Sequence, residues 1–375
     1  MTHLLVTNDF PPKVGGIQSY LFELWRRIPA SRFAVLTIAH REAAAFDAGL
    51  PFRIDRLDRP LLLPSRALRA RIRAMARETG ASLVVLDPAL PLGLLGPSLG
   101  LPYAVVLHGA EITVPARLPG TRALLSTVVR HAALAIAAGS YPAAEARRAV
   151  GGAMPPTVLV PPGVDVERFR PLEGHERLAA RARLGVAPDA QLIVSVSRLV
   201  PRKGMDVLIE AVGHLAPERP GLTLLIGGTG RDAPRLERLI ARTNAPVRML
   251  GRVADADLPA LDGTADVWAM CCRNRWGGLE QEGFGIVFLE AAAAGVPQVA
   301  GLSGGAADAV VDGGTGLVVD RPGDVAVVER ALGRLLDDPT LRARLGSAAR
   351  ARAVSEFDYE LLARRLDAAL VEHGG

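Results

Sequence analysis

The chain has 375 residues, of which 49% are apolar, 22% are charged and 4% are aromatic. A chain of this length exceeds one hydrophobic core, so we expect two globular domains and exclude a disordered or fibrous protein. Its two cysteines, Cys271 and Cys272, are adjacent, which argues against disulfides, structural zinc and thiol redox chemistry. No run of about 20 apolar residues occurs, so no membrane-spanning helix is expected.

The net charge of +5 is unevenly distributed, because residues 1–170 are net basic and residues 171–375 are net acidic. A basic half directs its surface toward anions such as phosphates, lipid headgroups or nucleic acid. Residues 3–8 have the pattern of a strand rather than of a secretory signal. Together with the unpaired cysteines, this pattern leads us to expect a cytoplasmic protein.

The first half alternates strand-like and helical segments. An apolar run over residues 3–7 leads to the pair Gly15-Gly16, and the apolar spacing of residues 17–27 is helical. In a doubly wound domain such a turn approaches a ligand's phosphate, although a glycine pair alone is weak evidence. Further strands are expected over five apolar runs: residues 33–39, 83–86, 103–107, 134–138 and 157–160.

Two features of this half suggest ligands. Residues 61–77 interleave arginines with apolar residues, and such a basic amphipathic helix either lies on an anionic membrane or simply covers the sheet. The membrane interpretation uses three side chains: Arg66, Arg69 and Arg73.

After the strand over residues 103–107 comes His108-Gly109-Ala110-Glu111. A lone histidine is more often structural, but the carboxyl end of a strand is where ligands bind.

A proline-rich linker at residues 161–171 separates the two halves. Six further strands are expected over residues 192–196, 222–226, 247–250, 267–270, 298–300 and 316–319, with helices over residues 205–215, 234–243 and 359–372. The fold class is therefore α/β, with two Rossmann-like doubly wound domains facing each other across a cleft. The domains are expected over residues 1–168 and 172–354, with residues 355–375 packing back on the first.

Loops after the strands of the second array carry candidate ligand contacts. Arg198, Arg202 and Lys203 follow its first strand, where cations suit a diphosphate, although ordinary loops can also be charged. Gly228, after the second strand, permits close backbone approach. Arg252 and Val253 follow the third strand as further candidate ligand contacts.

The most informative stretch is residues 280–297, where a glycine-rich turn precedes a short helix. Glycines in a helix interior cost about 1 kcal/mol each, so Glu282 lies in the turn. Gly295 and Pro297 end the helix, with Glu290 about two turns inside it. Free amides at the helix start suit a phosphate or sugar hydroxyls, although acidic residues there also complement the helix dipole. The amides belong to Gly283, Phe284, Gly285, Ile286 and Val287.

Asp255 and Asp257 have the Asp-x-Asp spacing that some transferases use to hold a divalent metal. They lie in a polar stretch at an expected helix start, and we interpret them as N-capping and solvated. No metal is expected.

These features together resemble the retaining glycosyltransferases of family 4, which have the GT-B fold, over nearly the whole chain. Four motifs of the family occur here in the same order. The acidic pair matches Glu282 and Glu290, and the Arg…Lys pair matches Arg198 and Lys203. The glycine turn matches Gly15-Gly16, and the His-Gly-x-Glu motif matches residues 108–111. Residues 8–20 and 272–287 further resemble the mannosyltransferases that act on phosphatidyl-myo-inositol mannosides. Those enzymes move mannose from GDP-mannose to the inositol 6-position of phosphatidylinositol monomannoside.

The resemblance implies a metal-independent, cofactor-free, front-face transfer with retention. Arg198, Lys203 and the amides of Gly15-Gly16 would stabilise the leaving diphosphate. Glu290 would accept the ribose hydroxyls, and Glu282 with the amides that follow it would hold the mannose. The acceptor would be bound by four residues: Asp9, Gln18, Tyr20 and His108. His108 would also contact the reacting sugar.

The acceptor would be an anionic lipid, with the protein bound peripherally at the inner face of the plasma membrane. Two alternatives stay open. Another family 4 enzyme could use a UDP- or ADP-sugar and a soluble acceptor. A non-catalytic nucleotide-sugar or nucleic-acid binding protein would explain the basic half but not the two carboxylates. With 4% aromatic residues, the chain also lacks the stacking platforms of RNA-binding proteins, so no nucleic acid partner is expected.

Overall fold

The computed structural model describes the backbone of residues 2–374 and separates into two compact units. The first unit comprises the chain up to residue 163 and again from residue 359, and the second comprises residues 164–358. The sequence predicted that the first domain ends at residue 168, the second begins at 172, and the chain returns to the first at 355. In the structure the chain passes between the units at 163–164 and at 358–359. The second crossing lies late because helix α14, Pro339–Glu356, packs within the second unit.

The first unit is built on a parallel seven-stranded sheet with the order β3-β2-β1-β4-β5-β6-β7. Because β2 and β4 flank β1, the strand order reverses there and the carboxyl ends of β1 and β4 lie at the switch point, where doubly wound folds bind ligands. The strands are β1 His3–Thr7, β2 Phe33–Ile38, β3 Arg53–Leu57, β4 Leu83–Asp87, β5 Tyr103–Leu107, β6 Leu134–Ala137 and β7 Thr157–Leu159.

Strand β3 was not predicted. Its sequence, Arg-Ile-Asp-Arg-Leu, alternates charged and apolar residues and lacks the apolar run that marked the other strands. It pairs only with β2 and forms the edge of the sheet, where charged side chains discourage pairing with another chain. Arg53 and Asp55 form an ion pair along it at 3.0 Å.

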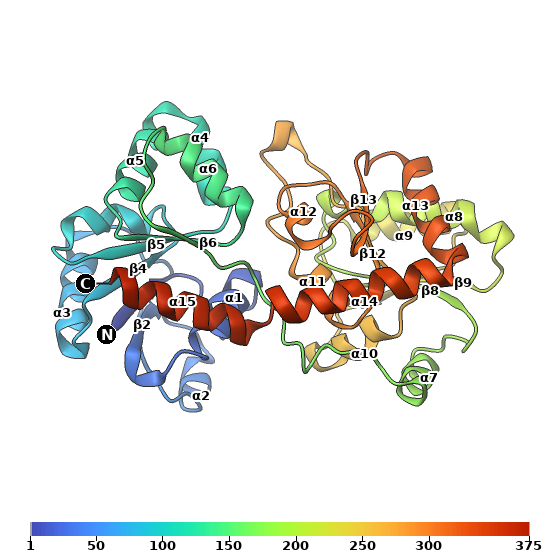
Figure 1. Cartoon of the computed structure of the whole chain (residues 1–375), viewed down its shortest axis with the longest axis horizontal. Helices are drawn as coiled ribbons and strands as arrows, with labels where there is room; N and C mark the ends of the chain where they lie inside the picture. The colour runs from blue at the N-terminus through green and yellow to red at the C-terminus, as the bar shows by residue number, and fades with distance from the viewer. Residues whose placement is uncertain (1, 375) are drawn as a thin grey trace. The chain divides into compact units, whose positions relative to one another are not determined.

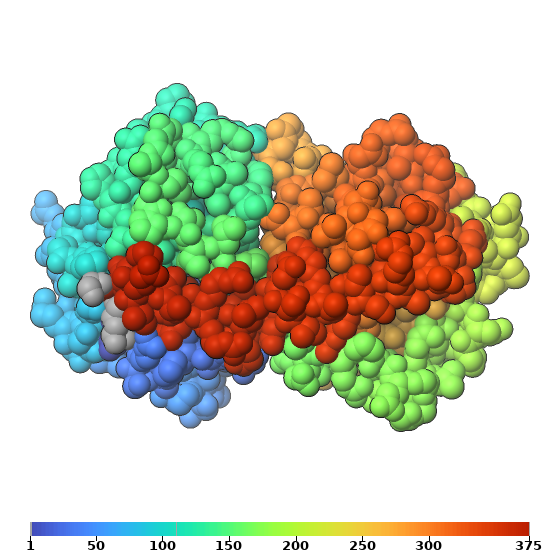
Figure 2. Space-filling model, viewed as in Figure 1, coloured from blue at the N-terminus to red at the C-terminus, as the bar shows by residue number. Residues whose placement is uncertain are grey.

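Helices cover both faces of this sheet, since successive strand residues point to opposite sides. Leu4 and Val6 of β1 join a core with α3, α5 and α6, whereas Leu5 packs with α1 and α15. Figure 1 shows α15 returning to the first unit beside α1, and in Figure 2 it lies on that unit's surface. The helices are α1 Gly16–Trp25, α2 Ala43–Asp47, α3 Arg66–Thr79, α4 Ala110–Arg117, α5 Pro119–Arg130, α6 Ser140–Val150 and α15 Tyr359–His373, with 3-10 turns at Ala30–Arg32 and Leu92–Ser98.

The second unit is built on a parallel six-stranded sheet with the order β10-β9-β8-β11-β12-β13. All six strands expected from the sequence are present. They are β8 Gln191–Val196, β9 Leu222–Gly227, β10 Val247–Gly251, β11 Val267–Met270, β12 Gln298–Gly301 and β13 Gly316–Val319. Both units are thus Rossmann-like parallel-sheet domains, as predicted.

The helices of the second unit alternate with its strands. The α-helices are α7 Gly174–Arg183, α8 Met205–Leu215, α9 Ala233–Thr243, α10 Leu258–Gly263, α11 Ile286–Ala293, α12 Ala306–Ala309, α13 Val325–Asp337 and α14. The 3-10 turns are Pro201–Lys203, Ala216–Glu218, Asp255–Asp257 and Trp276–Gly278.

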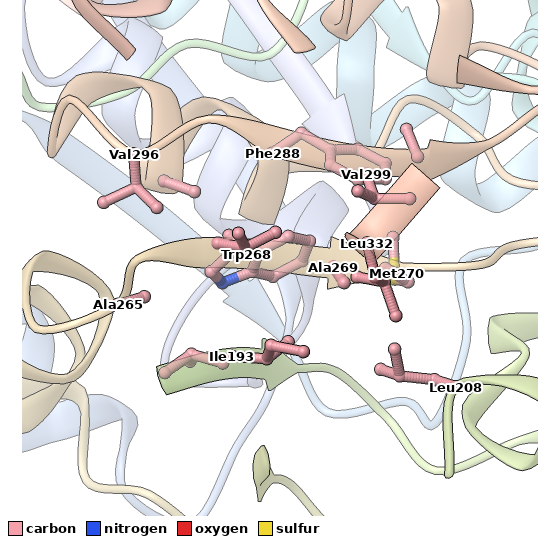
Figure 3. Packing of buried hydrophobic residues seen from close by; sticks show 14 of the residues in the cluster. Ile193, Leu208, Ala265, Trp268, Ala269, Met270, Phe288, Val296, Val299 and Leu332 are labelled. Carbon is pink, nitrogen blue, oxygen red and sulfur yellow. The ribbon is translucent and has the colours of Figure 1, made fainter. Parts of the chain in front are cut away.

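The core of the second unit anchors the helix that follows the glycine-rich turn. Phe288 of α11 packs edge-on against Trp268 of β11, with the ring centroids 5.3 Å apart. Figure 3 shows this pair among Ile193, Val299 and Leu332, which come from the neighbouring strands and α13. The indole Nε1 of Trp268 donates to the buried Asp262 at 3.0 Å. Helix α11 is therefore fixed on the sheet by apolar burial.

Candidate functional site

Buried polar residues meet at the carboxyl edge of the first sheet. Thr7 ends β1 and Asp87 ends β4, and the parallel register places them side by side. The Thr7 hydroxyl donates to Oδ2 of Asp87 at 2.6 Å, and Asp87 is 0% exposed. Asp87 was not among the predicted site residues; its only signal was an acidic residue directly after the apolar run at 83–86.

His108, which follows β5, completes this group. Its Nε2 lies 2.5 Å from Oδ1 of Asp87, and its ring packs edge-on against the ring of Tyr20 at 5.5 Å. Burial disfavours the charged ring, but the negative charges of Asp87, Glu111 and Asp9 outweigh it and raise the pKa of His108 to about 9. Because the folded pKa lies above the ordinary 6.5, this stabilisation is complete below pH 6.5 and is lost as pH rises through about 9.

Glu111 explains the last position of the His-Gly-x-Glu motif. Its carboxylate accepts from the backbone N–H of His108 at 2.5 Å and from that of Gly109 at 3.0 Å. The motif therefore fixes the backbone that carries the histidine, at the start of α4.

Asp9 and Gln18, both predicted acceptor contacts, are held together. Oδ1 of Asp9 accepts from Nε2 of Gln18 at 2.5 Å and from Nζ of Lys13 at 2.7 Å. Gly15 allows this arrangement, since a Cβ there would lie 2.2 Å from Oε1 of Gln18. Gly16, exposed, begins α1.

Tyr20 does not have the predicted geometry for binding an acceptor. It is 1% exposed, and its hydroxyl donates to the carbonyl oxygen of Val160 at 2.8 Å. The acceptor role predicted for Tyr20 was wrong, because the residue lies on the buried face of α1 with Leu21 and Leu24. Its ring instead supports His108.

In the second unit, opposite charges are buried together at the carboxyl edge of β8. Nζ of Lys203 donates to Oε2 of Glu282 at 2.7 Å, and Arg202 reaches the same oxygen at 3.3 Å. Lys203 and Glu282 are each 7% exposed. Burial alone would raise the pKa of Glu282, but Lys203, Arg202 and Arg198 lower it below its ordinary value. The stabilisation is therefore present above pH 4.5 and is lost as pH falls below it.

Arg198, by contrast, is exposed and acts on Glu282 through its charge. Gly228 lies next to this loop with φ +127°, and a Cβ on it would lie 1.9 Å from the carbonyl oxygen of Ser197. The two loops thus approach more closely than any other residue type at 228 would permit.

A loop that the sequence analysis missed fastens the Glu282 backbone. Its amide donates to Oγ of Ser303 at 3.1 Å, and its carbonyl accepts from Gly305 at 3.1 Å. Ser303 in turn donates to Oδ1 of Asn274 at 2.7 Å. A Cβ on Gly304 would lie 2.0 Å from the Glu282 carbonyl oxygen. The available signal was the Ser-Gly-Gly sequence just after the strand now seen as β12.

The turn from Glu282 to α11 is as predicted, except in the depth of Glu290. The helix begins at Ile286, followed by Val287, with Gly285 at φ +87° before it. Glu290 is therefore about one turn inside, not two. Burial raises the pKa of Glu290 to about 7, against the attraction of Arg168.

The amides of this turn face no protein acceptor. Within residues 2–374, the backbone N–H groups of residues 283–285 have no hydrogen-bond acceptor. Gly283 is exposed, and Phe284 is buried edge-on against Phe357 at 5.8 Å. The turn therefore offers free donors at a rigid position.

The structure places the predicted residues after β10 either at the surface or against the second sheet. Arg252 is exposed, and Val253 covers Gly227, where a Cβ would lie 2.8 Å from it. The interpretation of Asp257 as an N-cap was wrong, because its side chain caps nothing. Asp255 is exposed as predicted and pairs with Arg168 at 2.9 Å. Among the described residues, no group of three or more His, Cys, Asp or Glu side chains could hold a metal ion.

The arginine-rich segment is shorter as a helix than predicted. Helix α3 starts at Arg66, with Oγ of Ser65 accepting from the amide of Leu68, so residues 61–65 are not helical. Arg73 donates to the carbonyl oxygens of Ser98 and Leu99 at 2.6 and 2.7 Å. It holds a loop and is not free for a membrane, which leaves Arg66 and Arg69. No helix in residues 2–374 has the length and apolarity to cross a bilayer.

Comparisons with known proteins show the family of the chain. Residues 14–168 match the family described as Glycosyltransferase Family 4, and residues 176–352 match Glycosyl transferases group 1. The chain is 37% identical over 369 residues to the GDP-mannose-dependent monoacylated alpha-(1-6)-phosphatidylinositol monomannoside mannosyltransferase of Corynebacterium glutamicum, covering 97% of this chain and 96% of that one. It is 38% identical over 376 residues, with the same coverage, to the GDP-mannose-dependent alpha-(1-6)-phosphatidylinositol monomannoside mannosyltransferase of Mycobacterium tuberculosis.

Solved structures share the fold over the whole chain. Anabaena HepE in complex with UDP superposes with a TM-score of 0.82 at 25% identity, covering 99% of this chain and 100% of that one. Sucrose-phosphate synthase from Thermosynechococcus elongatus superposes with a TM-score of 0.79 at 23% identity, covering 99% and 98%.

We predict that replacing Lys203 by Met destabilises the second unit, because Glu282 then keeps a buried charge with one partner fewer. The expected loss is about 3 kcal/mol of unfolding free energy, measured by urea denaturation followed by circular dichroism. The double variant Lys203→Met/Glu282→Gln should lose less than the two single variants combined.

The matched control is Arg170→Met, which breaks an exposed ion pair with Glu176 and should leave the transition midpoint unchanged. Equal midpoints for Lys203→Met and the wild type would contradict the interpretation of Lys203 and Glu282 as a buried, interdependent pair.

Proposed function

Since the chain belongs to the glycosyltransferase family of the phosphatidylinositol monomannoside mannosyltransferases, we propose that it transfers mannose from GDP-mannose to the inositol 6-position of phosphatidylinositol monomannoside. The chain is a glycosyltransferase; its donor and acceptor are the proposed part. The observation that carries the proposal is similarity over 97% of the chain to enzymes named for this donor and acceptor. The buried Lys203–Glu282 contact supports it chemically.

The second unit supplies the donor chemistry. The Lys203 ammonium has three N–H donors, of which one is used on Glu282. The other two can bind diphosphate oxygens, and the exposed Arg198 adds a bidentate donor beside them. These cations stabilise the charge that develops on the leaving diphosphate, the task that a metal ion performs in other transferases. We therefore include metal independence in the proposal.

The turn before α11 binds the sugar. Glu282 is held ionised by its cations and accepts hydrogen bonds from mannose hydroxyls, while the free amides of residues 283–285 donate to others. Glu290, about one turn further along, accepts the ribose hydroxyls. Neither carboxylate is given the role of a nucleophile, since Glu282 is engaged by Lys203 and Arg202. Transfer with retention then proceeds on the front face, with the departing phosphate taking the acceptor's proton.

The first unit supplies the acceptor chemistry. Asp9, held by Gln18 and Lys13, accepts inositol hydroxyls. His108 donates to the sugar or to the phosphate near the reacting centre. Asp9 follows β1 at the switch point of the sheet, and His108 contacts Asp87 of β4 from the end of β5, which supports their use in binding.

The donor and acceptor are tested by incubating the purified chain with GDP-[14C]mannose and phosphatidylinositol monomannoside in mixed micelles with a chelator present. Label should pass to the lipid, and Lys203→Met should lower kcat/KM by about 100-fold, since a charge-assisted contact to the leaving group is lost. Arg170→Met is the control, because Arg170 pairs with Glu176 and has no role in the proposed contacts.

Transfer that occurs only from a UDP- or ADP-sugar, or only to a soluble acceptor, would refute the donor or acceptor assignment and leave the family intact. Transfer that requires an added divalent cation would refute metal independence.

We also propose that the chain docks peripherally on the inner face of the plasma membrane through the start of α3. Arg66 is exposed there, and Leu61 and Leu63 are 46% and 55% exposed beside it. Leu61 and Leu63 line, with neighbouring residues, a hollow of about 260 Å³. Exposed leucines next to arginines suit a surface of anionic lipid, where each cation contributes about 1 kcal/mol.

The prediction is that Arg66→Glu/Arg69→Glu weakens binding to vesicles containing phosphatidylinositol by at least about 10-fold in a sedimentation assay. The charge-matched control, Arg330→Glu/Arg334→Glu, reverses two exposed arginines of α13 in the second unit. An equal loss in both variants would mean that net charge alone governs binding, against a specific docking face.

A further inference from the structure

We propose that Asp87 is a positioning residue for the transfer reaction: with Thr7 it fixes the His108 imidazole so that Nε2 carries a proton and Nδ1 is presented to the substrate. The proposal rests on the proposed function, because it assumes that His108 meets a substrate. It adds a residue and an atom-level role that neither the sequence pattern nor the similarity to other enzymes assigns.

The geometry leaves the Asp87 carboxylate no freedom. It is fully buried at the end of β4, and each oxygen has one partner: Oδ1 has His108 and Oδ2 has Thr7. The Thr7 hydroxyl is itself held, because it accepts from the backbone N–H of Asp9 at 2.8 Å. The parallel pairing of Thr7 with Asp87 thus orients the carboxylate from the neighbouring strand.

This orientation determines the chemistry of the imidazole. A carboxylate only accepts hydrogen bonds, so Nε2 of His108 must carry a hydrogen whether the ring is neutral or charged. Among the residues that the structure describes, none is hydrogen-bonded to Nδ1. Nδ1 is therefore the ring atom left for a ligand.

The ring is also held in place from its other sides. Tyr20 of α1 packs edge-on against it, and Glu111 of α4 binds the His108 backbone amide. The charged groups that face it are Asp87 of β4, Glu111 of α4 and Asp9 after β1, and all three raise its pKa. Burial acts in the opposite direction, so the charge on the ring depends on these carboxylates.

The consequence is a fixed cationic N–H donor at neutral pH. Nδ1–H can hold a sugar hydroxyl or a phosphate oxygen and stabilise negative charge that develops there. His108 keeps its proton throughout, so no proton transfer to or from the ring is required. Without the Asp87 carboxylate, burial would be less opposed, so the pKa of the ring would fall and the hydrogen on Nε2 would no longer be dictated by its partner.

The test measures the titration of His108 in the full chain by NMR of 13C-labelled histidine, with His108→Gln identifying its resonance among the seven histidines. The wild-type midpoint is expected well above 6.5, and Asp87→Asn should bring it below 6.5 because burial is then less opposed. The pH profile of kcat is measured alongside. Asp87→Asn should lower kcat at pH 7.5 by about 100-fold, the loss expected for one donor to developing charge, with a smaller change in KM for the donor substrate.

Thr7→Val removes one hydrogen bond to Asp87, so it should lower the His108 midpoint and kcat, each by less than Asp87→Asn does. Thr7→Ser keeps the hydroxyl and should restore both values. These variants also decide the matter if Asp87→Asn does not fold. A fall in kcat with an unchanged His108 midpoint would overturn the proposal, since it would show only structural damage. The midpoint is measured without substrate, so an inactive wild-type enzyme would count against the proposed function and leave this test intact.

Discussion

The contact between Lys203 and Glu282 sets the architecture of the donor half. Both side chains are nearly inaccessible, and a buried charge that loses its partner costs several kcal/mol. The loop after β8 and the turn before α11 must therefore meet at one place. Glycine permits this approach: a Cβ on Gly204, which has φ +70°, would lie 1.9 Å from the carbonyl oxygen of Cys271. The charges that we propose to bind a diphosphate are thus held by backbone geometry and by each other.

The first unit also has a buried carboxylate paired with a basic side chain, formed by a different group of residues. There the carboxyl ends of β1 and β4 bring Thr7 and Asp87 together, and His108 joins them from the end of β5. In both units a buried carboxylate binds the nitrogen of a basic side chain at the carboxyl edge of a parallel sheet, where ligands bind in such folds. The partner differs because the proposed tasks differ: a flexible lysine suits a diphosphate, and a planar imidazole suits a single directed contact.

Apolar runs predicted twelve of the thirteen strands found within residues 2–374, since strands buried on both faces need them. The edge strand β3 escaped because its charged residues carry no such signal. Short motifs singled out Glu282 and Lys203, and the structure brings the two side chains into contact; their ligand roles stay predictions. Asp87 and Ser303 were not singled out, because their roles depend on partners 80 and 21 residues away. Tyr20 and Arg73 were given ligand roles that their protein partners, Val160 and the Ser98–Leu99 carbonyls, already exclude.

The most direct test of the central claim, that the second unit binds a nucleoside diphosphate through Lys203, is calorimetric titration of the full chain with GDP. The wild type should bind, and folded Lys203→Met should bind about 10- to 100-fold more weakly, the range expected for one charge-assisted hydrogen bond. Equal affinity in the two proteins, or no binding of GDP by the wild type, would contradict the claim.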